Sequence, residues 1–316
     1  MAWKNLRKIS RDGDLMNVGL IDVDGHNFPN LALMKISAWE KTQGNNVEWW
    51  NGLKYYDRIY QAKVFDDTYS KDTEFCINAG EIIKGGTGYG LRSDLPEAVE
   101  HIYPDYELYG ISDTAYGFLT RGCPRHCPFC IVGDKEGLVS HKVADLNEFW
   151  HGQKNIEIMD PNLLACKDRH ELLDELIKSG GCVNFNQGLD VRLLDQRTAE
   201  LINKVKTSMI HFAWDNYEFK TRENLEHARE WLSKDAGHIR VYVLTNYNTT
   251  HEQDLERIYT IRDIGFDPYV MIYNKPSAPA ITKRMARWCN AKWCFRQCER
   301  FEDYCTSKAQ RERGKP

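Results

Sequence analysis

From about residue 115 to residue 275 the sequence alternates between short apolar runs and helical patterns, with a step of about 30 residues. This alternation predicts parallel βαβ units. Six units are too few for a closed eight-stranded barrel, so we expect a partial (β/α)6 barrel of the TIM type. The six predicted strands are 117–120, 156–159, 182–185, 209–214, 239–244 and 269–273, and the predicted helices are 168–179, 195–205, 221–232 and 252–264.

The N-terminal third has its own α/β pattern. The apolar run at 17–23 and the segment 81–86 are predicted strands, and 30–42 is a predicted helix with Asn30 as its N-cap. A short helix is expected at 95–102, with Pro96 in its first turn. We therefore expect an α/β protein with a Rossmann-like, doubly wound domain at 1–110, the partial barrel at 111–278 and a helical tail at 279–316.

The overall composition limits the class of protein. The chain has 316 residues, of which 42% are hydrophobic and 28% charged, as in an ordinary soluble globular protein. It contains no run of about 18 apolar residues, and its start lacks the apolar segment of a signal peptide, so we expect a cytoplasmic protein without a membrane partner. The net charge of −4 argues against nucleic-acid binding by bulk charge. In the cytoplasm, clustered cysteines favour metal binding or catalysis over disulfides.

Polar side chains follow each predicted strand of the barrel. In such a barrel the active site lies at the carboxyl ends of the strands, so these side chains are expected at its mouth. Loops are polar in any soluble protein, but here amides and carboxylates recur at every strand exit. They are Thr120 and Arg121, Asp160 and Asn162, Asn186 and Gln187, Asp215 and Asn216, Asn246 and Asn248, and Asn274 and Lys275.

Three cysteines stand close together in the stretch GFLTRGCPRHCPFCIVG at 117–133. A zinc site would need a fourth ligand, and His126 lies between the cysteines on a tight loop. A dithiol made of Cys127 and Cys130 would leave Cys123 without a role, and buried structural cysteines do not fit a loop rich in proline. The remaining interpretation is a [4Fe–4S] cluster held by Cys123, Cys127 and Cys130, with one iron open to an exogenous ligand.

The Cys-x3-Cys-x2-Cys spacing, with the aromatic Phe129 before the last cysteine, resembles the radical S-adenosylmethionine superfamily over residues 115–275. The resemblance implies that the open iron binds S-adenosylmethionine and that an electron donor such as flavodoxin or ferredoxin reduces the cluster. It further implies cleavage of a carbon–sulfur bond to give a 5′-deoxyadenosyl radical, which abstracts hydrogen from a substrate. The sequence does not identify that substrate, and the catalytic residues are unknown.

Residues for binding S-adenosylmethionine are sought at the strand exits. Arg192 would bind the methionyl carboxylate through its planar fork of donors. Asp215 and Asn246 would bind the ribose hydroxyls. A role in contacting S-adenosylmethionine or the substrate is assigned to three further residues, although loop Asp and Asn residues also cap helices. These are Asn186, Gln187 and Asp190.

The N-terminal domain resembles the superfamily's subgroup with a cobalamin-binding-type domain. The matching features are the opening strand, a glycine turn at 85–86 and the segment 95–100. Histidine-ligated corrins use Asp-x-His-x-x-Gly, but here Asp24 and His26 are followed by Pro29 in place of the glycine. Cobalamin is therefore not favoured, and His26 is as well explained as an ordinary loop residue. Only Cys76 lies in this domain, which disfavours methylthiolation.

The tail is basic and contains four cysteines. Residues 283–316 hold ten Lys or Arg against four acids, a net charge of +6. A continuous helix over 287–305 would place Cys294, Cys298 and Cys305 on one stripe, with the first and last roughly 16 Å apart, too far for one metal. We therefore expect these three cysteines to pack beside Trp288, Trp293 and Phe295, with Cys289 facing elsewhere, and a single cluster per chain; a second metal site in the tail is the alternative. The alternative function is a non-catalytic iron–sulfur or zinc protein whose basic tail binds nucleic acid.

Overall fold

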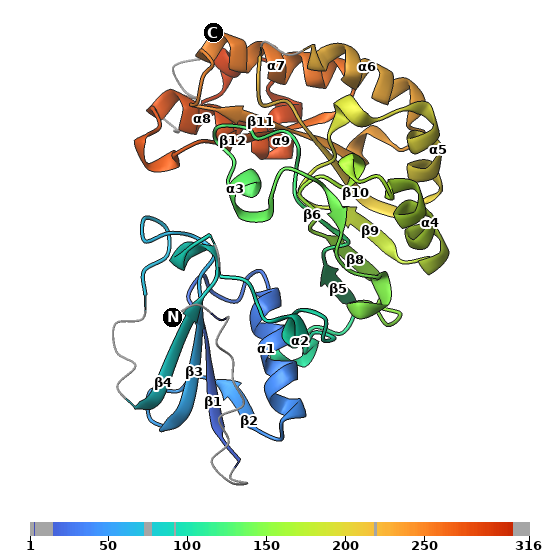
Figure 1. Cartoon of the computed structure of the whole chain (residues 1–316). Helices are drawn as coiled ribbons and strands as arrows, with labels where there is room; N and C mark the ends of the chain where they lie inside the picture. The colour runs from blue at the N-terminus through green and yellow to red at the C-terminus, as the bar shows by residue number, and fades with distance from the viewer. Residues whose placement is uncertain (1–2, 4–14, 73–77, 92, 218–219, 306–316) are drawn as a thin grey trace. The chain divides into compact units, whose positions relative to one another are not determined.

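The computed structural model describes residues 3, 15–72, 78–91, 93–217 and 220–305 (Figure 1). The chain divides into two compact units, Met1–Glu157 and Ile158–Pro316, which are called unit 1 and unit 2 below. Both are built from parallel strands and helices, which confirms the α/β class. None of the helices in the described part of the chain has the length and apolarity needed to cross a bilayer. Cys76 lies outside the described residues.

Unit 1 begins with a four-stranded parallel sheet of order β2-β1-β3-β4. The strands are β1 (Asn17–Asp22), β2 (Asn46–Trp49), β3 (Tyr56–Ala62) and β4 (Ala79–Gly85). In the register, Leu20 stands between Trp49 and Tyr60. The predicted strands at 17–23 and 81–86 are confirmed, whereas the sequence patterns did not predict β2 and β3.

Two helices accompany this sheet. Helix α1 (Leu31–Thr42) starts as predicted, because the Asn30 side chain accepts a hydrogen bond of 3.2 Å from the backbone N–H of Leu33. Leu33 and Ile36 of α1 are fully buried against Val18 and Leu20 of β1. The short helix α2 (Glu97–Glu100) follows Pro96 and packs on α1. A parallel sheet with accompanying helices is thus present, but the Rossmann-like, doubly wound arrangement is not confirmed.

The second part of unit 1 contains the start of the strand–helix repeat. Strand β5 (Thr114–Gly117) neighbours β8 (Asn155–Ile158), and β6 (Thr120–Arg121) pairs antiparallel with β7 (His141–Lys142). The strand predicted at 117–120 is therefore wrong in its position. A Cβ on Gly117 would lie 2.3 Å from the Phe149 ring, so this position requires glycine. The chain then leaves β5 and forms the separate β6–β7 hairpin.

Unit 2 continues the strand–helix alternation, with parallel strands in the order β12-β11-β10-β9. These are β9 (Cys182–Phe185), β10 (Thr207–Ala213), β11 (Ile239–Thr245) and β12 (Asp267–Ile272). Between them run α4 (Arg169–Ser179), α5 (Gln196–Lys204), α6 (Thr221–Trp231) and α7 (His251–Ile264). The predicted strands from 156 to 273 and the four predicted helices are confirmed, whereas the curvature of a partial barrel is not.

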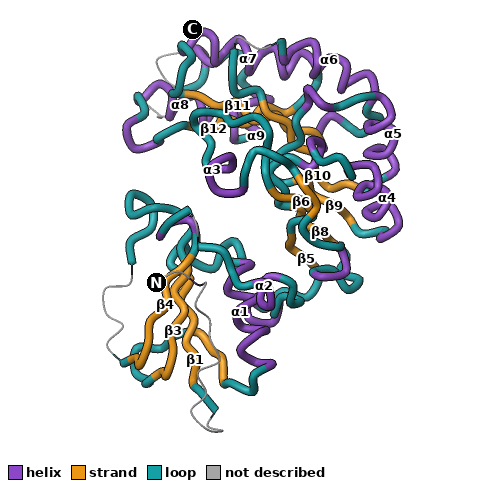
Figure 2. The backbone as a smooth tube through the Cα atoms, in the orientation of Figure 1, coloured by secondary structure: helices purple, strands orange, loops and turns teal. Residues whose placement is uncertain are grey.

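The two faces of the unit 2 sheet differ in composition. Figure 2 shows α4, α5, α6 and α7 along one side of the sheet. Strand β11 follows this division: Ile239, Val241 and Val243 are fully buried, whereas the alternating Arg240 and Tyr242 are only half-buried. Period-two alternation of this kind places the apolar set beneath the helices and the polar set on the opposite face. That opposite face is called the open face below.

The tail differs from the predicted continuous helix. It forms α8 (Ala280–Asn290) and α9 (Lys292–Gln297), with a break at Ala291. The break has a physical cause, because the Asn290 side chain turns to β12 and bonds both the N–H and the C=O of Val270, at 2.7 and 3.0 Å. This covers part of the edge of β12. The assumption of one continuous helix, from which the separation of roughly 16 Å between Cys294 and Cys305 was calculated, is therefore wrong.

The predicted packing of the tail holds in part. Cys289 and Cys294 are buried, and Trp288 is fully buried with its ring 4.8 Å from that of Phe295. Trp293 is instead 64% exposed, so its predicted place among the packed residues is wrong. Short 3-10 segments complete the fold at Thr87–Tyr89, Tyr106–Tyr109, Leu146–Glu148, Leu163–Ala165, Val191–Leu193, Ala236–His238, Lys275–Ser277 and Phe301–Asp303.

Candidate functional site

The three motif cysteines lie in unit 1 on a loop, residues 122–137, whose two ends are joined. The backbone N–H of Cys123 donates to the carbonyl of Gly137 at 3.1 Å. The Glu136 carboxylate accepts from Arg121 Nη1 at 2.7 Å and from the N–H of Gly122 at 3.2 Å. Gly122 has φ +86°, and a Cβ there would lie 2.2 Å from the carbonyl oxygen of Val139. The frame of this cysteine loop therefore depends on a glycine and on one carboxylate.

Within this loop the three cysteines are only partly buried. Cys123, Cys127 and Cys130 are all half-buried, as is Phe129. A tight turn links the last two cysteines, since the N–H of Cys130 donates to the carbonyl of Cys127 at 2.9 Å. Helix α3 (Val132–Glu136) follows at once. The loop thus presents three thiols from eight consecutive residues at a partly accessible surface.

The donor chemistry of the cysteine loop fits an iron–sulfur cluster, because thiolates are the usual ligands of such clusters. In the described part of the chain, however, no three Cys, His, Asp or Glu side chains are gathered in an arrangement that would hold a metal ion. The cysteine loop therefore fits a cluster by the chemistry of its donor atoms and by the spacing of its thiols along one closed loop. His126, with φ +44°, lies 3.8 Å from Asp134, which makes it part of the loop's own charge pattern.

In unit 2, the structure brings together three residues selected at the strand exits. Asp190 caps the segment Val191–Leu193 by accepting from the N–H of Arg192 at 3.2 Å. Its two oxygens also accept from Arg192 Nε and Nη2, at 2.7 and 3.1 Å. The Arg192 fork, predicted to bind a ligand carboxylate, is thus held by the protein's own carboxylate. Asp215 completes the group, since its pKa responds to both charges.

Asp215 has an unusual electrostatic environment. Burial raises its pKa to about 6, against the opposing influence of Arg257 and Arg192, while the neighbouring Asp190 carboxylate adds to the rise. A carboxylate with such a pKa is partly protonated near neutral pH. It is able to donate as well as accept a hydrogen bond in that range. Raised carboxyl pKa values of this kind occur at functional sites, and also in structural ion-pair networks.

The other selected strand-exit residues are spread along the edge of the unit 2 sheet. The backbone carbonyl of Asn186 accepts from the Tyr242 hydroxyl at 2.9 Å, and Gln187 is exposed. Asn246 has φ +62°, and its side-chain amide donates to the carbonyl of Tyr273 at 2.8 Å. Asn246 therefore links the exits of β11 and β12, so part of its hydrogen-bonding capacity is already used.

The sequence patterns did not select Arg257, which organises these exits from α7. Its side chain is fully buried and donates to the carbonyls of Trp214 and Leu244, at 2.5 and 2.7 Å. It also donates to Asp254 at 2.6 Å, one turn earlier in the same helix. The ends of β10 and β11 are thus tied to a single guanidinium. In the sequence Arg257 stands between a glutamate and an isoleucine in a predicted helix, and this context gives no signal for the role.

The loop after β1 carries Asp24 and His26, the two residues that resemble a corrin-ligand motif. Asp24 accepts from the N–H of Val64 at 2.6 Å and from the Ser70 hydroxyl at 2.6 Å, so its carboxylate fixes the loop after β3. The His26 ring lies against Trp49, with the centroids 4.1 Å apart. A metal-ligating histidine normally donates its second N–H to a carboxylate or carbonyl, and Asp24 is engaged elsewhere. These residues do not fit a histidine-ligated cobalamin.

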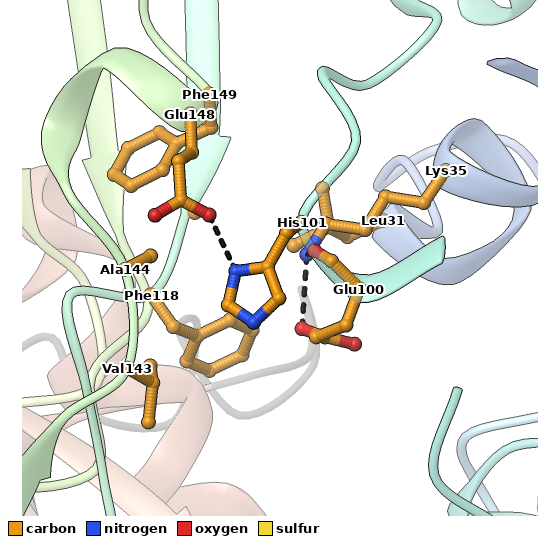
Figure 3. A pocket seen from close by; sticks show the side chains of 10 residues that line it. Leu31, Lys35, Glu100, His101, Phe118, Val143, Ala144, Glu148 and Phe149 are labelled. Carbon is orange, nitrogen blue, oxygen red and sulfur yellow. Dashed lines mark hydrogen bonds and ion pairs between the residues drawn. The ribbon is translucent and has the colours of Figure 1, made fainter. Parts of the chain in front are cut away.

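A small cavity lies elsewhere in unit 1, beside α1 and α2 (Figure 3). His101 Nδ1 lies 2.7 Å from Glu148, and Lys35 lies 2.9 Å from Glu100, at its rim. Its volume of about 20 Å³ is close to the space that one water molecule needs. The cavity is therefore too small for a substrate, and its charged groups are already paired.

Comparison with models of known protein families and with curated proteins returned no match. The functional assignment therefore depends on the residues described above.

Proposed function

We propose that the protein is a radical S-adenosylmethionine enzyme whose [4Fe–4S] cluster is held by Cys123, Cys127 and Cys130. The observation that carries this proposal is the Cys-x3-Cys-x2-Cys spacing on one short loop. When bound, the cluster and S-adenosylmethionine would supply one-electron cleavage of a carbon–sulfur bond, releasing methionine and a 5′-deoxyadenosyl radical, with the electron coming from a flavodoxin or ferredoxin.

The chain's own residues would supply ligands, orientation and charge. The hydrogen bonds between Glu136, Arg121 and Gly122 support the role of the loop, because they fix the backbone that carries the three thiols. For S-adenosylmethionine we propose the exits of the unit 2 strands. There Asp190 orients the Arg192 guanidinium toward one geometry, and Asp215 offers a carboxyl group able to donate or accept to a ribose hydroxyl.

The test is anaerobic reconstitution of the full chain with iron and sulfide, followed by incubation with dithionite and S-adenosylmethionine. The proposal expects about four irons per chain and formation of 5′-deoxyadenosine and methionine. Replacement of Cys123, Cys127 or Cys130 by alanine should abolish both, because three ligands leave none in reserve. Cys182→Ala is the matched control, since Cys182 lies at the start of β9 and outside the loop.

Two results would overturn this proposal. The first is a normal iron–sulfur spectrum in any of the three loop variants. The second is a bound cluster in the wild-type protein without any cleavage of S-adenosylmethionine, which would instead favour a non-catalytic iron–sulfur protein. Zinc in place of iron after expression under iron-replete, anaerobic conditions would favour the zinc alternative.

A further inference from the structure

Three charged or titratable side chains stand in one row across the open face of the unit 2 sheet. The parallel register places His211 of β10 opposite Arg240 of β11, and Arg240 opposite Asp267 of β12. In the next row, Tyr242 stands opposite Tyr269. Since alternate residues of a strand share a face, both rows lie on the side away from the helices.

The charges in this row are paired in an unexpected way. Asp267 is the carboxylate in register with Arg240, but it forms its ion pair with Lys292 of α9, at 2.6 Å. Within the described residues, Arg240 has no ion pair and no hydrogen bond; its guanidinium lies 5.3 Å from the centre of the Tyr269 ring. A half-buried guanidinium without an acceptor is costly, because part of its hydration is lost without replacement. Arg240 is therefore prepared to receive an anion.

His211 beside it is held in a single orientation. Its side chain is buried, its Nδ1 lies 3.0 Å from the carbonyl of Phe185, and its ring stacks on Tyr242 at a centroid distance of 4.9 Å. Burial lowers the pKa of His211 to about 4, and the nearby charges of Arg240 and Lys292 lower it further against the bond to Phe185. The imidazole is neutral at pH 7, and because Nδ1 faces a carbonyl it carries the hydrogen. Nε2 then offers a lone pair.

We propose that this row is a binding site for a small-molecule oxyanion, a carboxylate or a phosphate monoester, whose charge is received by Arg240 beside Lys292. His211 Nε2 accepts a hydrogen bond from a hydroxyl or N–H group of the same molecule. Arg240 and Asp267 lie at the amino ends of β11 and β12, away from the strand exits proposed for S-adenosylmethionine, so this inference goes beyond the proposed function. The binding of the anion does not require a cluster.

The test uses the full chain labelled with [15N]histidine and purified without iron. The probes are inorganic phosphate, propionate, and propionamide as the uncharged counterpart of propionate. We expect phosphate or propionate to shift the His211 nitrogen resonances, assigned with His211→Gln, and propionamide to leave them in place. Arg240→Met should weaken binding by about ten- to a hundredfold, the usual value of a charge-assisted hydrogen bond. Arg222→Met, on the exposed face of α6, is the matched control and should bind like the wild type.

A second variant keeps the proposal testable if Arg240→Met fails to fold. Lys292→Gln lies on the tail and removes the partner of Asp267, so that Asp267 is released to pair with Arg240. Anion binding should then weaken although Arg240 is present. Equal binding of propionamide and propionate, or unchanged anion affinity in either variant, would overturn the proposal. Which of the two anions binds more tightly distinguishes a phosphate from a carboxylate site. Failure of the proposed function can be distinguished from failure of this proposal, because the first is measured by the iron content after reconstitution and the second by anion binding to the iron-free protein.

Discussion

The cysteine loop of unit 1 and the strand exits of unit 2 differ in how far they bury and fix their candidate functional side chains. The cysteine loop keeps its reactive side chains half-buried and fixes only its backbone, through Glu136 and Gly122. The strand exits instead bury charged side chains against one another, with Arg257 at 0% exposure and Asp215 strongly desolvated. The first arrangement keeps three potential metal ligands partly accessible at the surface. The second produces a fixed electrostatic environment, whose cost is offset by internal pairing.

The largest expected effect lies at the strand exits. Arg257→Met removes the donor shared by the carbonyls of Trp214 and Leu244 and leaves the buried Asp254 without its charged partner. Breaking a buried pair from one side destabilises a protein by about 3–5 kcal/mol. Urea unfolding should show this loss, whereas Arg222→Met on α6 should change the midpoint little. A wild-type midpoint for Arg257→Met would show that the exits do not depend on this guanidinium.

The next effect tests the frame of the cysteine loop. Gly122→Ala adds a Cβ that would lie 2.2 Å from the carbonyl oxygen of Val139, at φ +86°. We expect a cost of about 2–4 kcal/mol, from left-handed strain and overpacking together. Gly137→Ala is a close control, since it has φ +91° but no atom within 4 Å, so only the strain of about 1–2 kcal/mol applies. Equal unfolding midpoints for the two variants would contradict a close-packed frame.

A smaller effect is expected from a change at Arg192, which is proposed to bind S-adenosylmethionine. Arg192→Lys replaces a planar fork by a single ammonium and loses the two-point contact with Asp190. Affinity for S-adenosylmethionine should fall by about tenfold or more, with the iron content unchanged. Isothermal calorimetry on the reconstituted protein measures this. Affinity equal to that of the wild type would remove Arg192 from the binding site while leaving the cysteine loop unaffected.

The smallest effect concerns the ionisation of Asp215. Its pKa rises from 3.8 unfolded to about 6 in the folded protein, because burial disfavours the charged form. The folded state therefore binds the proton more tightly, so the desolvation penalty is complete above pH 6 and disappears as the pH falls toward 4. Asp215→Asn should stabilise the protein by about 1–2 kcal/mol at pH 7, allowing for partial solvent screening, and by little at pH 4. A stability difference that stays constant between pH 4 and 7 would contradict the raised pKa.

Local patterns were sufficient for most of the secondary structure. The N-cap at Asn30 and the helix predicted at 252–264, observed as His251–Ile264, depend on neighbours a few residues away, so periodicity and capping residues predict them. Strand β3 was missed because it is buried on both faces and yet contains Arg58, which is satisfied by Glu40 of α1. A charged residue is not expected in a buried central strand, and only the ion pair with the distant Glu40 carboxylate explains why Arg58 is buried there.

The candidate site and the tail show the same contrast: contacts between neighbours in the sequence were predicted, and contacts between distant residues were not. The Asp190–Arg192 contact lies two residues apart, and its location in a strand-exit loop was predicted, although its role as an internal ion pair was not. The continuous tail helix was wrong because Asn290 finds its partner in Val270 of β12, twenty residues earlier. The residues around Asn290 do not predict its hydrogen bonds to Val270, since an asparagine is also tolerated within a helix.

The sequence by itself determined the alternation of strands and helices and the placing of three cysteines on one short loop. Both depend on spacing along the chain, which the period of a strand, a helix or a motif fixes directly. The tertiary structure alone decided which charges meet. Arg240 stands beside His211 and Asp267 because the register of parallel strands brings residues 27 and 29 positions apart into one row. Asp267 nevertheless forms its ion pair with Lys292, because the packing of α9 brings that ammonium group to 2.6 Å from the carboxylate.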